Sequence, residues 1–341
     1  MHSSASHPKT TKTVEKDEVP TGETTVPDVF KDRGPFKCPS RSDSISVTLD
    51  ADPNAANSGV MMAAQRGFFQ DAGLEVFVAG PKNPARAVKY VALGIDNVGV
   101  AQPPQVLLAG SEGGEPVVAL GSLMRQSNAA MIWLPASGIS DIADLEGKTI
   151  AVPGVPFQED FLAEVLARAG LTIEDVTVKR ANFDTAQALL EGRADATFGG
   201  TWNRDGAMLE ARGVKPVIKR ARDLGLPEYE ELVVIAPVRC VKKNPAVMRD
   251  FMAAVARGTR VAIKHPVQAA NFAAENYRLD PRFRMKDLRA EFAATTPLLS
   301  EDAHMDLAQI GRLADWMSAK GIIERRPPVH ELFTNDFLAN P

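Results

Sequence analysis

From Ile45 onward, short β-branched segments alternate with segments of helical periodicity, and this alternation constrains the fold more than any other feature. Strands that alternate with helices usually form mostly parallel sheets with helices on both faces. The sequence therefore predicts an α/β fold. The predicted strands are 45–49, 74–78, 98–101, 116–120, 130–134, 149–152, 176–179, 196–198, a segment near 216, and 232–236.

The length of the chain, 341 residues, predicts two lobes, because single hydrophobic cores stop growing near about 250–300 residues. Beyond Cys240 the sequence is almost entirely helical, with predicted helix starts at Pro245 and Pro266 and a further helix over 307–317. These helices have to pack on a lobe that is already formed, most economically the first one. The predicted lobes are a discontinuous first lobe, 45–137 with 240–341, and a second lobe, 138–239.

Residues 1–44 differ from the rest, since they are rich in Ser, Thr, Lys, Glu and Pro and show no period. Such a segment buries too little apolar surface to offset the entropy of ordering it, so we expect a disordered tail or tether. A basic start followed by an apolar stretch, typical of a signal peptide, is missing. Either the protein is cytoplasmic, or the chain begins after a removed signal or lipid-anchor segment.

The two cysteines, Cys38 and Cys240, leave two interpretations open. They form a disulfide if the protein lies in an oxidising compartment, and otherwise they are two free thiols. Two cysteines cannot build a zinc site or an iron–sulfur cluster by themselves, and none of the five His residues pairs at metal-ligand spacing. This scarcity predicts no metal and no cofactor, and it favours binding over catalysis. A formal charge of −4 predicts no nucleic-acid partner.

Candidate binding residues follow the predicted strands. In open α/β sheets, ligands lie beyond the carboxyl ends of strands and preferentially between domains. Carboxylates and amides at such positions can read the edge of a heterocycle, and an aromatic side chain can stack on its face. The segments in these positions are 50–57, 101–105, 125–128, 153–159 and 199–205.

Several of these segments resemble one family. Leu49–Gly59 is similar to the Leu-Asp-Trp-x-Pro-Asn-x-x-His-x-Gly signature of proteins that handle the pyrimidine half of thiamine. Val98–Ala109 and Phe198–Gly206 resemble the same thiamine-precursor group, and Glu228–Val233 is similar to its Tyr-Glu-Leu-Val segment. Arg66–Val76 matches the wider family of ABC-transporter binding proteins for nitrate, sulfonates and thiamine precursors.

The resemblance implies the type II periplasmic-binding fold, in which two α/β lobes close on a small ligand. It implies a substrate-binding component of an ABC importer, not an enzyme, with an ABC permease as partner, as a monomer. The location implied is periplasmic or extracytoplasmic, with or without a lipid anchor. Closure about a hinge near 136–140 and 237–241 would bury the ligand. The expected ligand-binding residues are Asp50, Asn54, Asn57, Gln102, Phe157, Trp202, Asn203, Asp205 and Glu231.

Three positions depart from the family's pattern. Ala51 stands in place of its tryptophan, Asn57 in place of its histidine, and Asp205 in place of its glutamate. Loss of the tryptophan removes one wall of an aromatic sandwich and leaves room for a bulkier ring, unless Phe157 fills the space. The expected ligands therefore include the thiamine pyrimidine precursor and larger flavin- or purine-like rings, with Trp202 as the expected stacking partner.

Two alternative functions stay open. The fungal-type hydroxymethylpyrimidine phosphate synthase shares much of the signature, and it resembles a single-turnover catalyst that supplies its own His and carries a Cys-rich iron-binding motif. Asn57 and the scarcity of Cys speak against this activity. A binding protein for an alkanesulfonate or nitrate would need several anion-reading groups, and Arg125 is the one candidate at a strand end.

Overall fold

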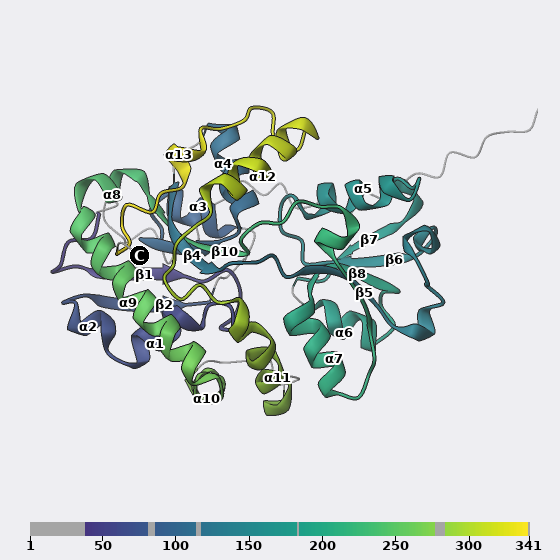
Figure 1. Ribbon diagram of the computed structural model, residues 1–341, viewed down its shortest axis with the longest axis horizontal. Coiled ribbons are helices and arrows are strands. Elements are labelled where there is room, and N and C mark those ends of the chain that lie inside the picture. Colours follow the sequence, from purple (N-terminus) through teal and green to yellow (C-terminus); the bar gives the residue numbers. More distant parts are fainter. Residues whose placement is uncertain (1–37, 81–85, 114–116, 183, 277–283, 340–341) are drawn as a thin grey trace, which may run out of the picture. The chain divides into compact units, whose positions relative to one another are not determined.

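The computed structural model describes residues 38–80, 86–113, 117–182, 184–276 and 284–339. In this part of the chain, ten strands form two five-stranded sheets, with helices on both faces (Figure 1). Each predicted strand is present, although several ends shift by a few residues. The α/β fold with two sheets is therefore confirmed.

The two sheets have the same internal arrangement. The first sheet has the order β2-β1-β3-β10-β4, and the second has the order β7-β6-β8-β5-β9. The strands of the first sheet are β1 (Ser44–Thr48), β2 (Glu75–Ala79), β3 (Val98–Ala101), β4 (Val117–Met124) and β10 (Leu232–Pro237). Those of the second sheet are β5 (Ala129–Trp133), β6 (Thr149–Val152), β7 (Thr177–Arg180), β8 (Ala196–Thr201) and β9 (Val217–Arg220).

The helices fall into three groups along the chain. Those that follow strands of the first sheet are α1 (Ser58–Gln65), α2 (Phe68–Asp71), α3 (Ala87–Ala92) and α4 (Pro103–Glu112). Those of the second sheet are α5 (Gln158–Arg168), α6 (Thr185–Leu190), the π-helical turn η6 (Trp202–Gly206) and α7 (Ala207–Ala211). The C-terminal group is α8 (Val238–Lys243), α9 (Pro245–Lys264), α10 (Pro266–Asn276), α11 (Met285–Thr295), α12 (Leu307–Ala319) and α13 (Val329–Leu332).

The sheets are mixed and not mostly parallel as predicted, because each contains one reversed strand that makes two of its four strand pairs antiparallel. β10 pairs antiparallel with β3 and β4, and β5 pairs antiparallel with β8 and β9. The remaining pairs in both sheets are parallel. In each sheet, the reversed strand is the one that the chain forms on arriving from the other sheet.

These two reversed strands correct the predicted lobe boundaries. The predicted boundaries place β5 in the first lobe and β10 in the second, whereas the sheet pairing places each in the opposite lobe. The reason is that an apolar pattern locates a strand without specifying which sheet it joins. The chain passes between the sheets at 125–128 and 221–231, and we propose these passages as the lobe boundaries and the hinge, in place of 136–140 and 237–241.

The segment before β1 belongs to the first lobe. Residues 1–37 of the predicted tail lie outside the described residues, but the prediction of a tail is wrong for 38–44. Cys38 forms a disulfide with Cys240 of α8, and Arg41 forms an ion pair with Asp250 of α9. Of the two interpretations of the cysteines, the structure therefore shows the disulfide.

The C-terminal helices pack mainly on elements of the first sheet. α9 packs along α1, and α12 and α13 contact α4. Two of them also reach the second lobe, since α11 contacts α7 and η6. Trp316 of α12 meets Phe161 of α5 edge to face, with ring centroids 5.0 Å apart. Phe157 and Tyr229 complete this aromatic cluster at centroid distances of 4.8 and 6.3 Å from Phe161.

Candidate ligand-binding site

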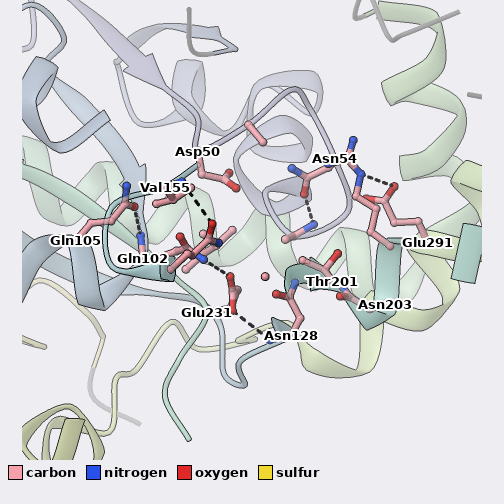
Figure 2. Close-up of a pocket in the computed structure, with 16 residues that line it drawn as sticks. Asp50, Asn54, Gln102, Gln105, Asn128, Val155, Thr201, Asn203, Glu231 and Glu291 are labelled. Atoms are coloured by element: carbon pink, nitrogen blue, oxygen red, sulfur yellow. Dashed lines mark hydrogen bonds and ion pairs between the residues drawn. The ribbon is translucent and has the colours of Figure 1, made fainter. Parts of the chain in front are cut away.

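A pocket lies where the carboxyl ends of strands from both sheets meet, which is the place that the strand pattern predicts (Figure 2). Segments after β1, β3, β6 and β8 contribute to it, together with both chain passages and α11. The lining residues are Asp50, Ala51, Asn54, Ala56, Gln102, Gln105, Asn128, Val155, Gln158, Gly199, Thr201, Asn203, Arg204, Glu231, Leu232 and Glu291.

The segment after β1 is shaped by side chains that bond to its own backbone. Asn54 Oδ1 accepts a hydrogen bond from Ala56 N at 2.8 Å, and Asn57 Oδ1 accepts one from Asn54 N at 3.0 Å. Asn favours turns of this kind because its short side chain reaches nearby backbone groups. Asn57 Nδ2 also donates to Asp50 Oδ1 at 3.1 Å. Asn57 is fully buried, so it positions Asp50 from behind the pocket wall.

Glu231, directly before β10, links three segments at the pocket. Its Oε1 accepts a hydrogen bond from Gln102 Nε2 at 2.5 Å, and its Oε2 accepts one from Asn128 N at 3.1 Å. Gln102 is the N-cap residue of α4, and its backbone N–H donates to Gln105 Oε1 at 3.0 Å. The Glu231 carboxylate thus joins one chain passage to the other and to the start of α4 (Figure 2).

Asp205 holds the turn that follows β8. Its Oδ2 accepts hydrogen bonds from Thr185 Oγ1 at 2.9 Å and from Thr201 N at 2.7 Å. The carboxylate is therefore used inside the second lobe, and Asp205 does not line the pocket. The turn that it fixes places Asn203 and Arg204 at the pocket.

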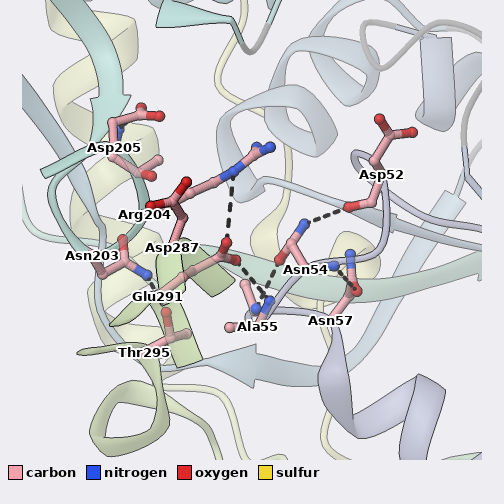
Figure 3. A network of polar contacts seen from close by, with 12 residues as sticks. Asp52, Asn54, Ala55, Asn57, Asn203, Arg204, Asp205, Asp287, Glu291 and Thr295 are labelled. Carbon is pink, nitrogen blue, oxygen red and sulfur yellow. Dashed lines mark hydrogen bonds and ion pairs between the residues drawn. The ribbon is translucent and has the colours of Figure 1, made fainter. Parts of the chain in front are cut away.

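The pocket has more acidic than basic side chains. Asp50, Glu231 and Glu291 line it, and Arg204 is the cation among the lining residues. Burial raises the pKa of all three carboxyl groups, and the nearby Arg204 only partly lowers the pKa of Asp50 and of Glu291. Arg204 Nε lies 3.9 Å from Glu291 Oε2 (Figure 3). This balance favours a ligand that presents hydrogen-bond donors or positive charge.

The buried carboxyl groups predict a decrease in stability as the pH rises. Burial raises the pKa of Glu231, and also that of its neighbour Glu230, from 4.5 to about 7. Between these pH values the folded protein binds more protons than the unfolded chain, so the free energy of unfolding falls as pH increases. For Glu231 the raised pKa corresponds to about 3 kcal/mol.

Urea unfolding at pH 5 and at pH 8 measures this effect. We expect wild-type protein to be less stable at pH 8, and Glu231→Gln to reduce the difference by about 3 kcal/mol, because the amide does not titrate. Equal pH dependence in wild type and variant would show that Glu231 ionises normally.

Five of the nine predicted site residues line the pocket. They are Asp50, Asn54, Gln102, Asn203 and Glu231. Asn57 and Asp205 lie behind its walls and hold lining segments in place, as described above. Ala51, the position where the family's tryptophan is absent, also lines the pocket.

Two predicted aromatic residues lie elsewhere. The ring of Trp202 is covered by Arg220, whose guanidinium carbon lies 4.1 Å from the ring centroid. Phe157 belongs to the aromatic cluster with Phe161. The lining residues of the described structure include no aromatic side chain, so neither residue is placed to stack on a ligand in the pocket.

Several lining residues were not predicted. Arg204 lies inside the quoted motif and Asn128 inside a strand-end segment, so a sequence signal existed for both. Gln105 also lies inside a strand-end segment, 101–105, and it is the third residue after the helix cap Gln102. Glu291 has none, because it lies far along the chain on the buried face of α11, and tertiary packing alone brings it to the pocket.

Arg125, the predicted anion-binding candidate, lies outside the pocket. Its Nη2 is 3.0 Å from Asp302 Oδ1, and both side chains are about half exposed. Its guanidinium is therefore engaged with a surface carboxylate of the C-terminal part of the chain.

Comparison with known proteins supports the resemblance seen in the motifs. The sequence profile described as "NMT1/THI5 like" matches residues 54–269, which is more than half of the chain. The chain belongs to this family. A formylaminopyrimidine-binding protein of Halalkalibacterium halodurans is 30% identical over 229 residues, which cover 67% of this chain and 69% of the relative.

The NMT1/THI5-like family includes proteins named as enzymes as well as binding proteins. The 4-amino-5-hydroxymethyl-2-methylpyrimidine phosphate synthase THI13 of Saccharomyces cerevisiae is 26% identical over 238 residues, covering 67% of this chain and 69% of the synthase.

The fold itself is that of type II periplasmic binding proteins. The alkanesulfonate-binding protein SsuA of Xanthomonas axonopodis pv. citri superimposes with a TM-score of 0.67 at 17% identity, covering 87% of this chain and 99% of that one. At this identity the likeness concerns the fold alone. In the part of the chain that the structure describes, no helix combines the length and apolar character needed to cross a membrane.

Proposed function

We propose that this protein is the substrate-binding component of an ABC importer, and that its pocket takes an aminopyrimidine precursor of thiamine. The binding step would be closure of two lobes about the passages 125–128 and 221–231. No bond would be made or broken. The formylaminopyrimidine-binding relative supports the class of ligand, and the fold supports the two-lobed mode of binding.

The observation that carries the proposal is a set of buried acceptors in the pocket. Among the described residues, Asn128 Oδ1 and Asn203 Oδ1 are buried and accept no hydrogen bond. Leaving such an atom unpaired costs about 1–3 kcal/mol, so these atoms favour a ligand that donates to them. Together with the carboxylates of Asp50 and Glu291, they give the pocket several hydrogen-bond acceptors, which suit the amino group of a pyrimidine.

The same groups argue against an anionic ligand. An alkanesulfonate or nitrate would have to lie beside three carboxylates, with Arg204 as the cation among the lining residues. Arg204 already lies near Glu291, and its charge acts on the buried carboxyl groups around it. At a pH where these carboxyl groups are ionised, their repulsion of an anion would outweigh the attraction of this single cation.

The disulfide supports an extracytoplasmic location, because disulfides persist in oxidising compartments and are rare in the cytosol. An ABC permease as partner, a monomeric state and a lipid anchor remain part of the proposal and rest on the family resemblance.

Isothermal titration calorimetry tests the proposed ligand. We expect formylaminopyrimidine or 4-amino-5-hydroxymethyl-2-methylpyrimidine to bind one molecule per chain with a Kd of about 1 μM or lower, which corresponds to about −8 kcal/mol. An alkanesulfonate and nitrate are the negative controls. Binding of the sulfonate, with no binding of either pyrimidine, would contradict the proposal.

The similarity to the yeast synthase makes an enzyme the second candidate. Incubation with pyridoxal phosphate and iron, followed by intact-protein mass spectrometry, separates the two functions. A single-turnover synthase that consumes its own side chain would lose mass. A binding protein would keep its mass unchanged, which is the result we expect.

A further inference from the structure

Two contacts between the lobes, among the described residues, differ in chemical character. One is the aromatic cluster in which Trp316 of α12 packs on Phe161 of α5. The other joins α11 to the turn η6 and to α7, and it contains several hydrogen bonds and ion pairs. Separating an aromatic contact exposes apolar area to water at about 25 cal/mol per Å², whereas water can replace the partners of polar groups. The polar contact is therefore the one suited to open.

α11 carries one polar residue per turn on its buried face. Asp287, Glu291 and Thr295 recur at four-residue spacing, so they form one stripe along the helix. On the same buried face, Phe292 packs into an apolar cluster with Met61 and Met62 of α1, which attaches α11 to the first lobe.

Each residue of this polar stripe has a partner in the second lobe. Asp287 Oδ2 accepts hydrogen bonds from Arg212 Nη2 at 2.8 Å and from Arg212 Nε at 3.1 Å. Glu291 lies beside Arg204, and Thr295 Oγ1 accepts a hydrogen bond from Asn203 Nδ2 at 2.7 Å (Figure 3).

The stripe connects this contact to the pocket. Glu291, its middle residue, lines the pocket and accepts a hydrogen bond from Ala55 N of the first lobe at 2.9 Å. Asn203 lines the pocket from the second lobe. Arg212 and Asp287 do not line the pocket, although the side chain of Asp287 is fully buried and that of Arg212 is 12% exposed.

A second link outside the pocket joins the same two helices. Lys286 Nζ donates a hydrogen bond to Ala211 O, at the C-terminal end of α7, at 2.7 Å. Lys286 is exposed, so its removal leaves no buried charge. Burial alone would raise the pKa of Asp287, but the hydrogen bonds from Arg212 and from the Arg284 amide lower it, which keeps Asp287 ionised at neutral pH.

We infer that Asp287 with Arg212, and Lys286 with Ala211, form an interlobe latch that keeps α11 against the second lobe and so positions Glu291 and Asn203 around the ligand. The aromatic cluster remains packed while the latch opens and closes. This inference rests on one part of the proposed function, namely that the pocket binds a ligand. The latch residues are positioning residues, which act on the ligand through Glu291.

The latch is tested with Arg212→Gln and Lys286→Ala, and with Arg193→Gln as the matched control. Arg193 forms ion pairs with Asp184 and Glu191 within the second lobe, so it reports the loss of an arginine ion pair that does not join the lobes. Lys286→Ala is included because Arg212→Gln leaves Asp287 buried without its cation and could impair folding.

In ligand-free protein, small-angle X-ray scattering is expected to give a larger radius of gyration for both latch variants than for wild type and control. With bound aminopyrimidine, stopped-flow measurements are expected to show dissociation about tenfold faster for Arg212→Gln, with association changed less than twofold. If wild type binds no pyrimidine, the proposed function fails, and the scattering of ligand-free protein still tests the latch. Equal radii of gyration for wild type and both latch variants would overturn the inference of a latch.

Discussion

Asp50→Asn is expected to weaken aminopyrimidine binding by about 10–100-fold, because it replaces a charged acceptor in the pocket by a neutral amide. The variant should nevertheless fold at least as well as wild type. Burial raises the pKa of Asp50, which means that the folded state disfavours its charge. The amide oxygen of Asn can still accept the hydrogen bond from Asn57. Calorimetric titration and thermal unfolding of the same samples measure both effects.

Asp52→Asn is the matched control for this variant. Asp52 lies two residues further along the same segment, is exposed, and does not line the pocket. We expect its affinity for the ligand to remain within about twofold of wild type, since a screened surface charge contributes little. Equal losses of affinity in the two variants would mean that Asp50 makes no specific contact with the ligand. The negative charge of the segment would then act only through long-range electrostatic attraction. A lower melting temperature for Asp50→Asn would contradict the idea that the Asp50 charge serves binding at the expense of stability.

The strands could be predicted because their signals are local. A β-branched segment such as 149–152 or 232–236 is bounded by polar or turn-forming residues, and the same apolar side chains that mark it in the sequence are buried in the sheet. The direction of β5 and β10 could not be predicted in this way. It depends on the chain having crossed from one sheet to the other, and no local pattern records that crossing.

The site shows the same division. Asp50, Asn54 and Asn203 could be predicted, because each follows a strand and lies in a motif. Trp202 was expected to stack on the ligand because it lies among polar residues at a strand end, whereas a core tryptophan usually lies within an apolar stripe. Successive residues on a helical turn point in different directions, and Trp202 lies against Arg220 while Asn203 lines the pocket. Glu291 shows the opposite error, since only the packing of α11 brings it to the pocket.

Removal of the disulfide is expected to have the largest effect on stability. Cys38 and Cys240 are separated by 202 residues, so the bond closes most of the folded chain into one loop. In the chain-entropy account a disulfide restricts the unfolded state, and the loss of a native one typically costs about 2–5 kcal/mol. We therefore expect Cys38→Ser with Cys240→Ser to lower the free energy of unfolding in urea by that amount. Dithiothreitol should lower it similarly in wild type and leave the double variant unchanged.

The ligand affinity of the double variant should stay close to that of wild type, because the disulfide joins α8 to the segment before β1 and neither cysteine lines the pocket. Other contacts hold the same segment, since Asn244 Nδ2 donates to Pro39 O at 2.8 Å and Arg41 Nη1 donates to Ala72 O at 2.7 Å. The first lobe should therefore keep its fold at ambient temperature. If the double variant is fully folded but binds the ligand much more weakly, the segment before β1 must influence the pocket. It would do so through β1, which leads directly to Asp50. We expect Asp50→Asn to change binding without lowering stability, and the disulfide variant to change stability without changing binding. Together, the two variants test whether the pocket and the attachment of the segment before β1 act independently.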